Sequence, residues 1–395
     1  MKSVLIPLLM SFTLTLTDKT ALQEFIDGNN LFTASVYKEI LKTNNDNFLA
    51  SPFSAELVIA LTQSGAKDET AQEIRTSLRL PDDQQRLESS VTALRPVLKN
   101  DQGYAFQTAN KLYVKDKFAV NDEFKKVATD VFDGHVENID FLKKEEAAKA
   151  MNQWVEQQTN DKIHDLIDPE TLTDRTRVIV INALYFKGNW SVSFPKYLTS
   201  KQDFHKNANE ALQVDTMHET DYYNYHESPE LNAKFLELSF QGEDASMTIV
   251  LPNEKEGLAA LESQIDKIFV SPNYSREYVN VAVPKFKFET KMDFKGILKN
   301  LGVTKAFKDD EADLSGIAGE KGDLVVDEVI QKTFVDLNEE GVEAAAATYV
   351  EVGVPLSGFF PSAPPKDFVA DHPFIFYIKV KDLVLFVGRV SAPTL

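Results

Sequence analysis

The sequence predicts an α+β fold with large, mostly antiparallel β-sheets, because helical patterns dominate before residue 167 and β-rich runs dominate after residue 177. The chain has 395 residues, of which 43% are hydrophobic, and this is enough to bury one large core. No linker rich in Pro, Gly and Ser and no internal repeat divides it. We therefore expect a single domain over residues 18–395, preceded by a short N-terminal segment.

Helical periodicity is clearest in the first half of the chain. Residues 20–45 carry apolar side chains at helical spacing, and the triplet Gly28-Asn29-Asn30 predicts a break between two helical pieces. Asn121 is a typical N-cap residue and predicts a helix that ends near Ala128. Further helices are expected at residues 54–61, from residue 68 onward, at 84–95 and at 145–167.

Strands are indicated by runs of β-branched and aromatic residues. Residues 177–186 (RVIVINALYF) form an almost continuous apolar run, which predicts a strand buried on both faces. Residues 235–240 and 246–251 indicate the two strands of a hairpin. Other strands are expected at residues 106–114, 278–288, 324–337, 374–378 and 383–387.

The N-terminus has the pattern of a secretory signal peptide. Residues 1–17 (MKSVLIPLLMSFTLTLT) combine Lys2 with an apolar run that is too short to span a bilayer comfortably. The alternative is an N-terminal core helix, but Pro7 and the Ser and Thr content suit a helix interior badly. We therefore expect a secreted, extracellular protein without a further transmembrane stretch.

Composition argues against several classes of function. With 61 acidic and 42 basic residues, the net charge of −19 is opposite to what broad nucleic-acid binding requires. The absence of cysteine excludes thiol catalysis and cysteine metal sites. No Gly-x-Gly-x-x-Gly or Gly-x-Ser-x-Gly motif occurs, and the six histidines lack the spacing of a zinc helix. We expect neither an enzyme nor a metal site, and no nucleic-acid or membrane partner.

The most informative segment covers residues 338–352 (NEEGVEAAAATYVEV). From Val342 onward every second residue is small or β-branched, whereas the alternate set carries Glu343 and Glu351. This alternation is typical of a strand with one buried face, although four consecutive alanines form strands poorly. Residues 353–365 have the Gly, Pro and Ser content of an exposed loop. A segment suited to both states indicates a conformational switch.

This segment resembles the hinge and the reactive loop of the serpins, which inhibit serine proteases with a bait loop. Four further blocks resemble the family and occur in the family's order. They are NFLASPFS at residues 47–54, NALYFKGNW at 182–190, FVADHPFIF at 368–376 and FVGRV at 386–390. The resemblance implies the serpin fold, with three β-sheets, about eight or nine helices and an exposed reactive-centre loop at about residues 341–365.

The resemblance also implies a mechanism and a partner. A chymotrypsin-fold serine protease would attack a loop bond with its own serine and form a covalent acyl-enzyme. The hinge would then insert into the main sheet as a new strand and trap the protease. The hinge residues are Glu339, Glu340, Gly341, Val342, Glu343, Ala344, Ala345, Ala346, Ala347 and Thr348. Val342 departs from the family, in which Thr or Ser is commoner at this position.

The residues that would control opening of the sheet match the family in part. Ser51, Ser54 and Asn182 match positions that hydrogen-bond the central strands from below, and Trp190 matches the tryptophan at the top of the gap. Gln331 stands where the family usually has a histidine. Because glutamine can donate and accept, we expect a polar gate to remain.

The scissile bond is displaced from the position that the family count predicts. The usual count from the hinge glycine arrives at Pro355, which suits the acyl side of the bond badly, and the loop is several residues longer than usual. The candidate residues on the acyl side are Leu356, then Ser357, then Phe359. No Lys or Arg lies between Gly341 and Pro365, so chymotrypsin-like or elastase-like targets are expected.

Two further expectations concern the surface. The sequons at Asn189 and Asn273 predict glycosylation; Asn273 should be exposed, whereas Asn189 lies beside Trp190 at a strand end. A sulfated polysaccharide is the one cofactor considered, and a solvated charged face is the simpler interpretation of the basic residues that would bind it. These residues are Arg86, Arg95, Lys99, Lys111, Lys115 and Lys117.

We expect a monomer that acts as an inhibitor. The alternative is a serpin-fold protein that does not inhibit, such as a carrier, a storage protein or a chaperone. Bulky, charged or proline residues on the inward face of the hinge would favour this alternative, and none occurs there before Pro355.

Overall fold

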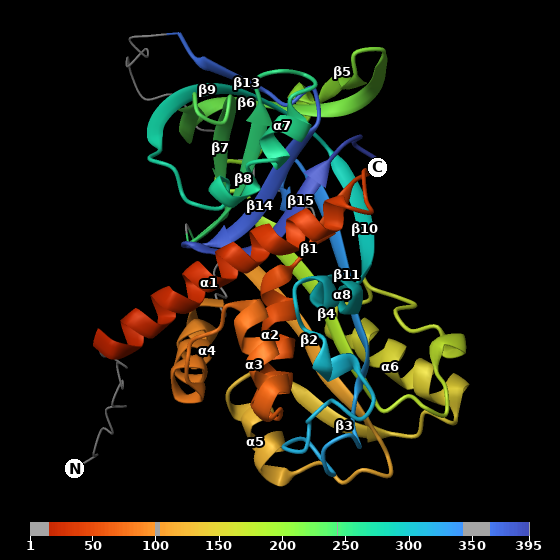
Figure 1. The fold of residues 1–395 in the computed structure, drawn as a ribbon. Coiled ribbons are helices and arrows are strands. Elements are labelled where there is room, and N and C mark those ends of the chain that lie inside the picture. Colours follow the sequence, from red (N-terminus) through yellow and green to blue (C-terminus); the bar gives the residue numbers. More distant parts are fainter. Residues whose placement is uncertain (1–15, 99–102, 243, 343–363, 395) are drawn as a thin grey trace, which may run out of the picture.

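The computed structural model describes residues 16–98, 103–242, 244–342 and 364–394, which form two β-sheets with helices packed around them (Figure 1). These residues contain eight α-helices, in agreement with the number expected from the sequence. They are α1 Leu16–Leu41, α2 Pro52–Ser64, α3 Asp68–Leu78, α4 Gln84–Leu98, α5 Asp122–Asp130, α6 Lys144–Gln158, α7 Leu258–Glu262 and α8 Phe294–Asn300.

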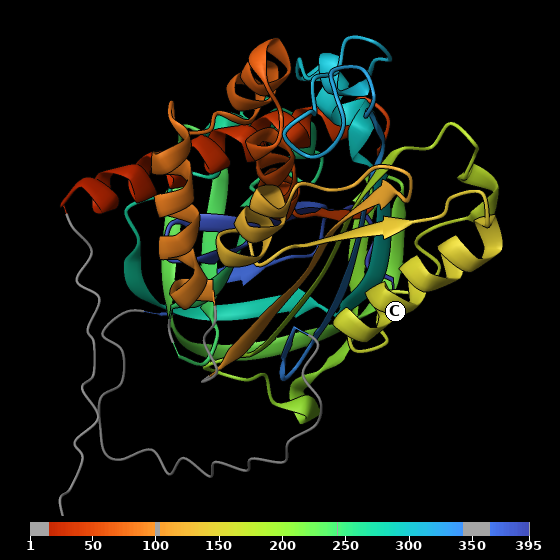
Figure 2. The same ribbon diagram turned by 90° about the horizontal axis from the view of Figure 1, so that it is seen from below.

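A six-stranded sheet occupies the middle of the molecule. In spatial order its strands are β10 Phe286–Asp293, β11 Val326–Asn338, β12 Gly341–Val342, β4 Val178–Asn189, β2 Tyr104–Lys115 and β3 His135–Ile139. Helices α2 and α6 lie on opposite faces of this sheet, as the view from below shows (Figure 2). The main hydrophobic cluster fills the side of α2, and a second cluster lies between α6 and the strands β2 and β4.

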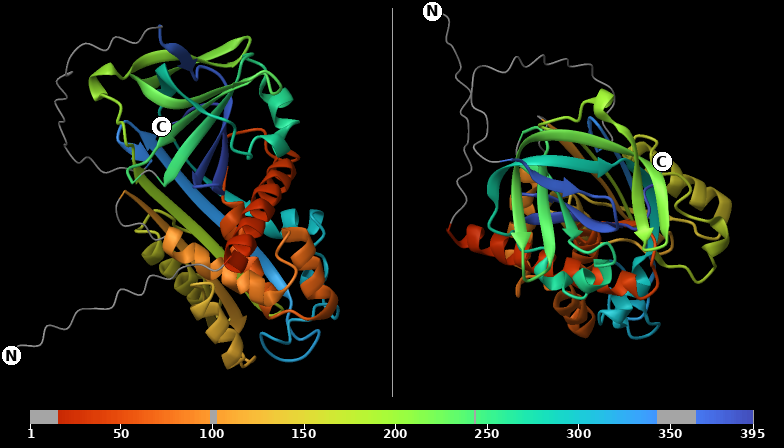
Figure 3. Two further views of the ribbon diagram at one scale, coloured as in Figure 1. Left: turned by 90° about the vertical axis from the view of Figure 1, so that its left-hand side faces the viewer. Right: turned by 90° about the horizontal axis from the view of Figure 1, so that it is seen from above.

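A nine-stranded sheet lies above the six-stranded one (Figure 3). Its path runs through β1 Phe48–Ala50, β15 Leu383–Val390, β14 Phe374–Val380, β8 Ala245–Pro252, β7 Ala233–Ser239, β6 Glu210–Ser228, β9 Ser275–Pro284 and β13 Lys366–Val369, with β5 Ser200–Asn207 paired to β6. The sequence-based expectation was three sheets. Among the described residues two of them form one hydrogen-bonded sheet, because the long strand β6 pairs with β9 along its middle and with β7 at its end.

The expected break in the first helix is wrong, since α1 continues through residues 28–30. A side chain at Gly28 would collide with the Arg79 carbonyl oxygen, 2.5 Å from the position of its Cβ. The Asn29 amide donates to the Val384 carbonyl at 2.9 Å, and the Asn30 amide donates to the Asp382 carbonyl at 2.9 Å. The triplet therefore docks the helix closely on its neighbours and does not interrupt it.

Two other boundaries predicted from the sequence are wrong. Helix α6 ends at Gln158 and not at residue 167, because Asn160, Asp161 and Asp165 adopt positive φ angles of 49°, 57° and 49°. The expected strand at residues 278–288 is two strands in different sheets, β9 and β10, separated by Lys285. Strand β9 ends at Pro284, which has no amide hydrogen to extend a ladder.

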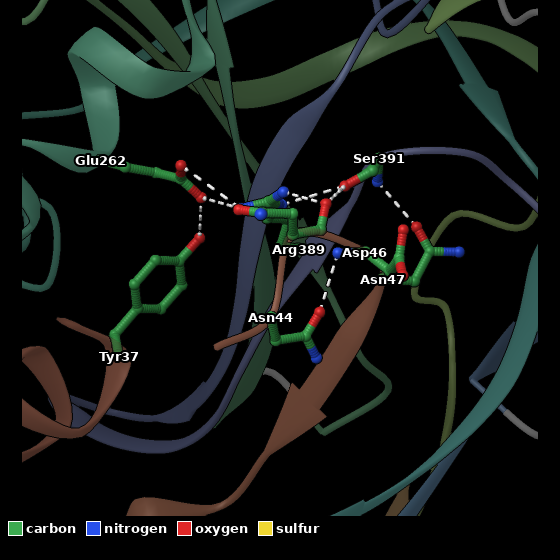
Figure 4. Close-up of polar contacts among 8 residues, drawn as sticks. Tyr37, Asn44, Asp46, Asn47, Glu262, Arg389 and Ser391 are labelled. Carbon is green, nitrogen blue, oxygen red and sulfur yellow. Dashed lines mark hydrogen bonds and ion pairs between the residues drawn. The ribbon is translucent and has the colours of Figure 1, made fainter. Parts of the chain in front are cut away.

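A buried ion pair connects α1, α7 and β15 (Figure 4). Arg389 Nη1 lies 3.1 Å from Glu262 Oε1, and both side chains are less than 10% exposed. The Tyr37 hydroxyl donates to the same carboxylate at 2.8 Å, and Arg389 Nε donates to Ser391 Oγ at 2.9 Å. Burial raises the pKa of Glu262, while Arg389 and Tyr37 act in the opposite direction. This cluster fixes the first helix to the last strand.

Candidate functional site

The six-stranded sheet contains the start of a strand between two of its central strands. Strands β11 and β4 run parallel and pair directly from Val326 to Thr333 of β11. Above this region β12 enters between them: Val342 pairs with Leu337 of β11 and, on its other side, with Gly188 of β4. Strand β12 is antiparallel to both neighbours, so its direction leads into the line along which β11 and β4 meet.

Only glycine fits the first position of β12. Gly341 has φ +153°, and an added Cβ would lie 1.9 Å from the Gly188 carbonyl oxygen. The next residue, Val342, is 1% exposed and belongs to the main hydrophobic cluster. The close approach of Gly341 and the burial of Val342 therefore hold the beginning of the hinge inside the sheet.

The turn between β11 and β12 is held by two segments, one that follows β4 and one at Lys285 between β9 and β10. Glu339 forms an ion pair with Lys285 at 3.0 Å and accepts a hydrogen bond from Thr199 Oγ1 at 2.9 Å. Burial opposes ionisation of Glu339, but hydrogen bonds from its own amide, Lys285 and Thr199 outweigh it and lower its pKa. Glu340 forms an ion pair with Lys196 at 2.7 Å. These bonds join the turn to elements distant in sequence.

Trp190 closes the top of the site. Its backbone amide donates to the Glu340 carbonyl at 2.8 Å, and its indole Nε1 donates to the Asn338 carbonyl at 3.0 Å. The indole stacks on Phe240 with ring centroids 4.7 Å apart and an interplanar angle of 11°. The structure thus places Trp190 directly beside the hinge turn.

A buried polar network lies under the paired part of β11 and β4. Gln331 Nε2 donates to the Ser51 carbonyl at 2.8 Å, and the Ser51 amide donates to Gln331 Oε1 at 2.8 Å. Gln331 Nε2 also donates to Asn182 Oδ1, which connects the two strands through their side chains. The Asn182 amide donates in turn to Ser54 Oγ and to Asn110 Oδ1. The structure therefore joins the predicted gate residues Ser51, Ser54, Asn182 and Gln331 in one hydrogen-bond network.

The partners that sequence reasoning missed carry little local signal. Asn110 could have been noticed, because asparagine is depleted in strands. Thr199 and Lys285 lie 140 and 54 residues from Glu339, so no local pattern relates them to it.

Glu56, on the helix that supports the gate, is fully buried and neither of its carboxylate oxygens has a hydrogen-bond partner. Burial alone raises its pKa well above the usual value.

Several predicted positions lie outside the described residues. They are hinge residues 343–348 and the candidate bond residues Leu356, Ser357 and Phe359. Asn273 is exposed, whereas Asn189 is half-buried and its carbonyl accepts from the Gln241 amide at 2.8 Å.

The basic residues considered for a polysaccharide do not form a common unpaired surface among the residues described. Arg86 pairs with Glu24, and Arg95 pairs with Asp133 at 3.3 Å. Lys111 is 6% exposed and lies 2.6 Å from the Glu137 carboxylate. The Lys115 ammonium donates to the Asp174 carbonyl, Lys117 lies over the Phe118 ring, and Lys99 falls outside the described residues.

No group of three or more His, Asp or Glu side chains is placed to hold a metal ion in the described part of the chain. None of its described helices is both long enough and apolar enough to cross a membrane.

Comparison with known proteins identifies one family. The family model described as serpin (serine protease inhibitor) matches residues 27–393. Alaserpin of Manduca sexta is 37% identical over 386 residues, which cover 96% of this chain and 97% of the relative. Antichymotrypsin-2 of Bombyx mori is 36% identical over 368 residues, covering 92% of this chain and 96% of the relative. The crystal structure of Serpin48 of Tenebrio molitor superposes with a TM-score of 0.88 at 54% identity, covering 94% of this chain and 99% of that structure.

Proposed function

Because this chain belongs to the serpin family and has its fold, we propose that it inhibits an extracellular serine protease as a suicide substrate. In this proposal the protease cleaves the loop, forms an acyl-enzyme and is trapped when the hinge inserts between β11 and β4. The supporting observation is β12, in which Gly341 and Val342 already pair with both strands. The bait requires no catalytic residue of this chain.

The register of β12 indicates where an inserted hinge would lie. Val342 pairs with Leu337 and Gly188, so antiparallel continuation would place Ala344 between Val335 and Phe186. Four residues after Ala344, Thr348 would lie between Gln331 and Asn182, which are direct neighbours in the present ladder. Insertion would therefore replace the Gln331–Asn182 hydrogen bond by pairing of each strand with Thr348. Val342 is already buried on the inward side, and Ala344 and Thr348 would share that side because strand residues alternate.

The loop sequence supports a target of the chymotrypsin or elastase type. The chain has no Lys or Arg between Gly341 and Pro365, so the specificity pocket of a trypsin-like enzyme finds no matching residue. Leucine suits an apolar pocket, and a bond after Leu356 is the smallest departure from the family count. We propose Leu356–Ser357 as the reactive bond, with the bonds after Ser357 and Phe359 as the next candidates. Secretion, cleavage of a signal peptide and glycosylation at Asn273 complete the proposal.

The test is incubation with a panel of serine proteases, followed by a search for an adduct that survives SDS. The proposal expects an adduct with at least one chymotrypsin-like or elastase-like enzyme. Mass spectrometry of the released C-terminal fragment identifies the bond. A fragment that begins at Ser357 supports the assignment, whereas a fragment that begins at Gly358 or Phe360 assigns the reactive bond to the position after Ser357 or Phe359. Cleavage of the loop by every protease without any adduct would contradict inhibition and favour the non-inhibitory alternative.

A further inference from the structure

The outer face of strands β6, β9 and β13 differs in composition from the rest of the surface. The register aligns Tyr222 with Tyr278, Thr220 with Asn280, and Asn280 with Asp367, so these side chains share one face. We call this set, together with Val369, the β13 face. The opposite face of the same strands is core, since Tyr223, Val279 and Phe368 are 5%, 0% and 0% exposed.

The β13 face exposes aromatic and apolar side chains. Tyr222 is 44% exposed and Val369 is 43% exposed, and the rings of Tyr222 and Tyr278 lie 5.2 Å apart. Its acidic residue, Asp367, accepts a hydrogen bond from the Asn280 amide at 3.0 Å. Tyrosine is enriched in protein–protein interfaces relative to the rest of the surface.

A hollow opens on the same face at Asn280 and Val369. It has a volume of about 270 Å³, and its walls combine the apolar side chains of Phe204, Ala282 and Val369 with a larger number of polar ones, among them Asp203, His218, Asn280 and Asp371. The Nε2 atom of His218 is buried without a hydrogen-bond partner. A ridge of aromatic side chains next to a hollow with polar and apolar walls can receive a protruding side chain of a partner.

The position of the β13 face in the chain indicates the partner. Strand β13 begins at Lys366, which pairs with Val279, so the preceding residue, Pro365, leads away from the sheet next to Tyr278. Eight residues, 357–364, separate the proposed bond from Pro365, and at ~3.3–3.6 Å per residue they span at most about 30 Å. A chymotrypsin-fold domain of roughly 200–250 residues has a radius of gyration of about 17 Å. A protease bound at the reactive bond is therefore within reach of this face.

We infer that the β13 face is a docking surface for the target protease, contacted on the primed side of the reactive bond before the loop is cleaved. This inference rests on the proposed function. The Tyr222–Tyr278 pair supplies the raised contact, and the hollow beside Val369, with its polar and apolar walls, accepts a protruding side chain of the protease. Contacts of this kind raise the rate of productive encounter and the selectivity among proteases, without affecting insertion of the hinge.

The first test compares Tyr222→Ser and Val369→Ser with Leu142→Ser, a matched control whose side chain is 64% exposed next to α6. The protease is the one that wild-type protein traps fastest in the panel. We expect each face variant to reduce the second-order rate of adduct formation about tenfold, with unchanged melting temperature and unchanged stoichiometry of inhibition. The control should keep the wild-type rate. Rates within twofold of wild type for both face variants would overturn the inference.

The second test does not depend on inhibition. Because the chain has no cysteine, Thr220→Cys and Leu142→Cys each provide a single site for an environment-sensitive fluorophore. The probe protein is the same protease with its catalytic serine replaced by alanine, which binds the loop without forming an adduct. We expect a spectral change at position 220 and none at position 142. No change at 220 would overturn docking, whereas a change at 220 produced by concentrating the labelled protein alone would assign the face to a second copy of this chain. If position 220 responds although no adduct ever forms, the proposed function fails and the docking surface stands.

Discussion

Replacement of Val342 by arginine places a charge at the first step of hinge insertion. The valine side chain is 1% exposed between Leu337 and Gly188. An unpaired guanidinium at this position costs several kcal/mol, so the variant relieves the cost most easily by withdrawing β12 from the sheet. Withdrawal forfeits burial of the valine, worth about 1.5–3 kcal/mol, and a few backbone hydrogen bonds at about 0.5–1.5 kcal/mol each.

The total destabilisation of the hinge by Val342→Arg is therefore roughly 3–5 kcal/mol. For a chain of 395 residues the entropy of unfolding is about 0.8 kcal/mol per kelvin, so the melting temperature should fall by about 4–6 °C. Insertion must then bury the unpaired guanidinium, and a cost of about 3–5 kcal/mol at this step slows insertion by about 10²- to 10⁴-fold. Deacylation is then faster than insertion, and the protein changes from an inhibitor into a substrate.

The assay combines thermal unfolding with SDS electrophoresis after incubation with the target protease. Val342→Arg should be cleaved in its loop without leaving an adduct. Val342→Thr is the matched control, since threonine is similarly branched and uncharged, and it should trap protease at close to the wild-type stoichiometry. If the arginine variant traps protease at the wild-type ratio, Val342 does not lead the insertion and the assignment of the hinge is wrong.

Three further changes test single features of the structure. Gly341→Ala places a Cβ 1.9 Å from the Gly188 carbonyl oxygen, so it should expel β12 and lower the melting temperature by several degrees; an unchanged value would contradict the described β12. Glu262→Gln removes the charge that compensates the buried Arg389, and we expect a loss of about 3–5 kcal/mol by denaturant unfolding, whereas a loss below about 1 kcal/mol would show that the pair is dispensable. The pKa of Glu56 is raised by burial, so the folded state binds this proton more tightly than the unfolded state does. The stability that protonated Glu56 contributes is present below the unfolded pKa and is lost as the pH rises through the folded pKa. Glu56→Gln removes this dependence, and its advantage in melting temperature over wild type should grow from acidic to neutral pH; a constant difference would refute an uncompensated acid at this position.

The sequence predicted the elements whose patterns are local. The apolar run at residues 177–186 became the buried part of β4, and the hairpin at residues 235–251 is β7 and β8. The long strand β6 was missed because its sequence, EALQVDTMHETDYYNYHES, carries polar side chains on its outer face at most positions. Its burial comes from packing against other strands, which no periodicity in a short window reveals.

Several features depend on contacts between distant segments and could not be predicted. Gly28 resembles a helix breaker but serves a close approach to Arg79. The gate residues were found through resemblance, whereas Asn110, which joins them, was not. The register of β12 could not be derived from alternation alone, because alternation assigns residues to a face but does not identify the partner strand.

The melting temperature of the protein before and after a single cut in the loop tests insertion most directly. The cut is made by a protease that the protein does not trap, and its place within residues 353–363 is verified by mass spectrometry. Ten inserted residues, 343–352, gain roughly ten backbone hydrogen bonds at about 0.5–1.5 kcal/mol each. At about 0.8 kcal/mol per kelvin, insertion should raise the melting temperature by about 6–19 °C. A cut protein that melts at the temperature of the intact one would show that the hinge does not enter the sheet, and the proposed inhibitory mechanism would fail.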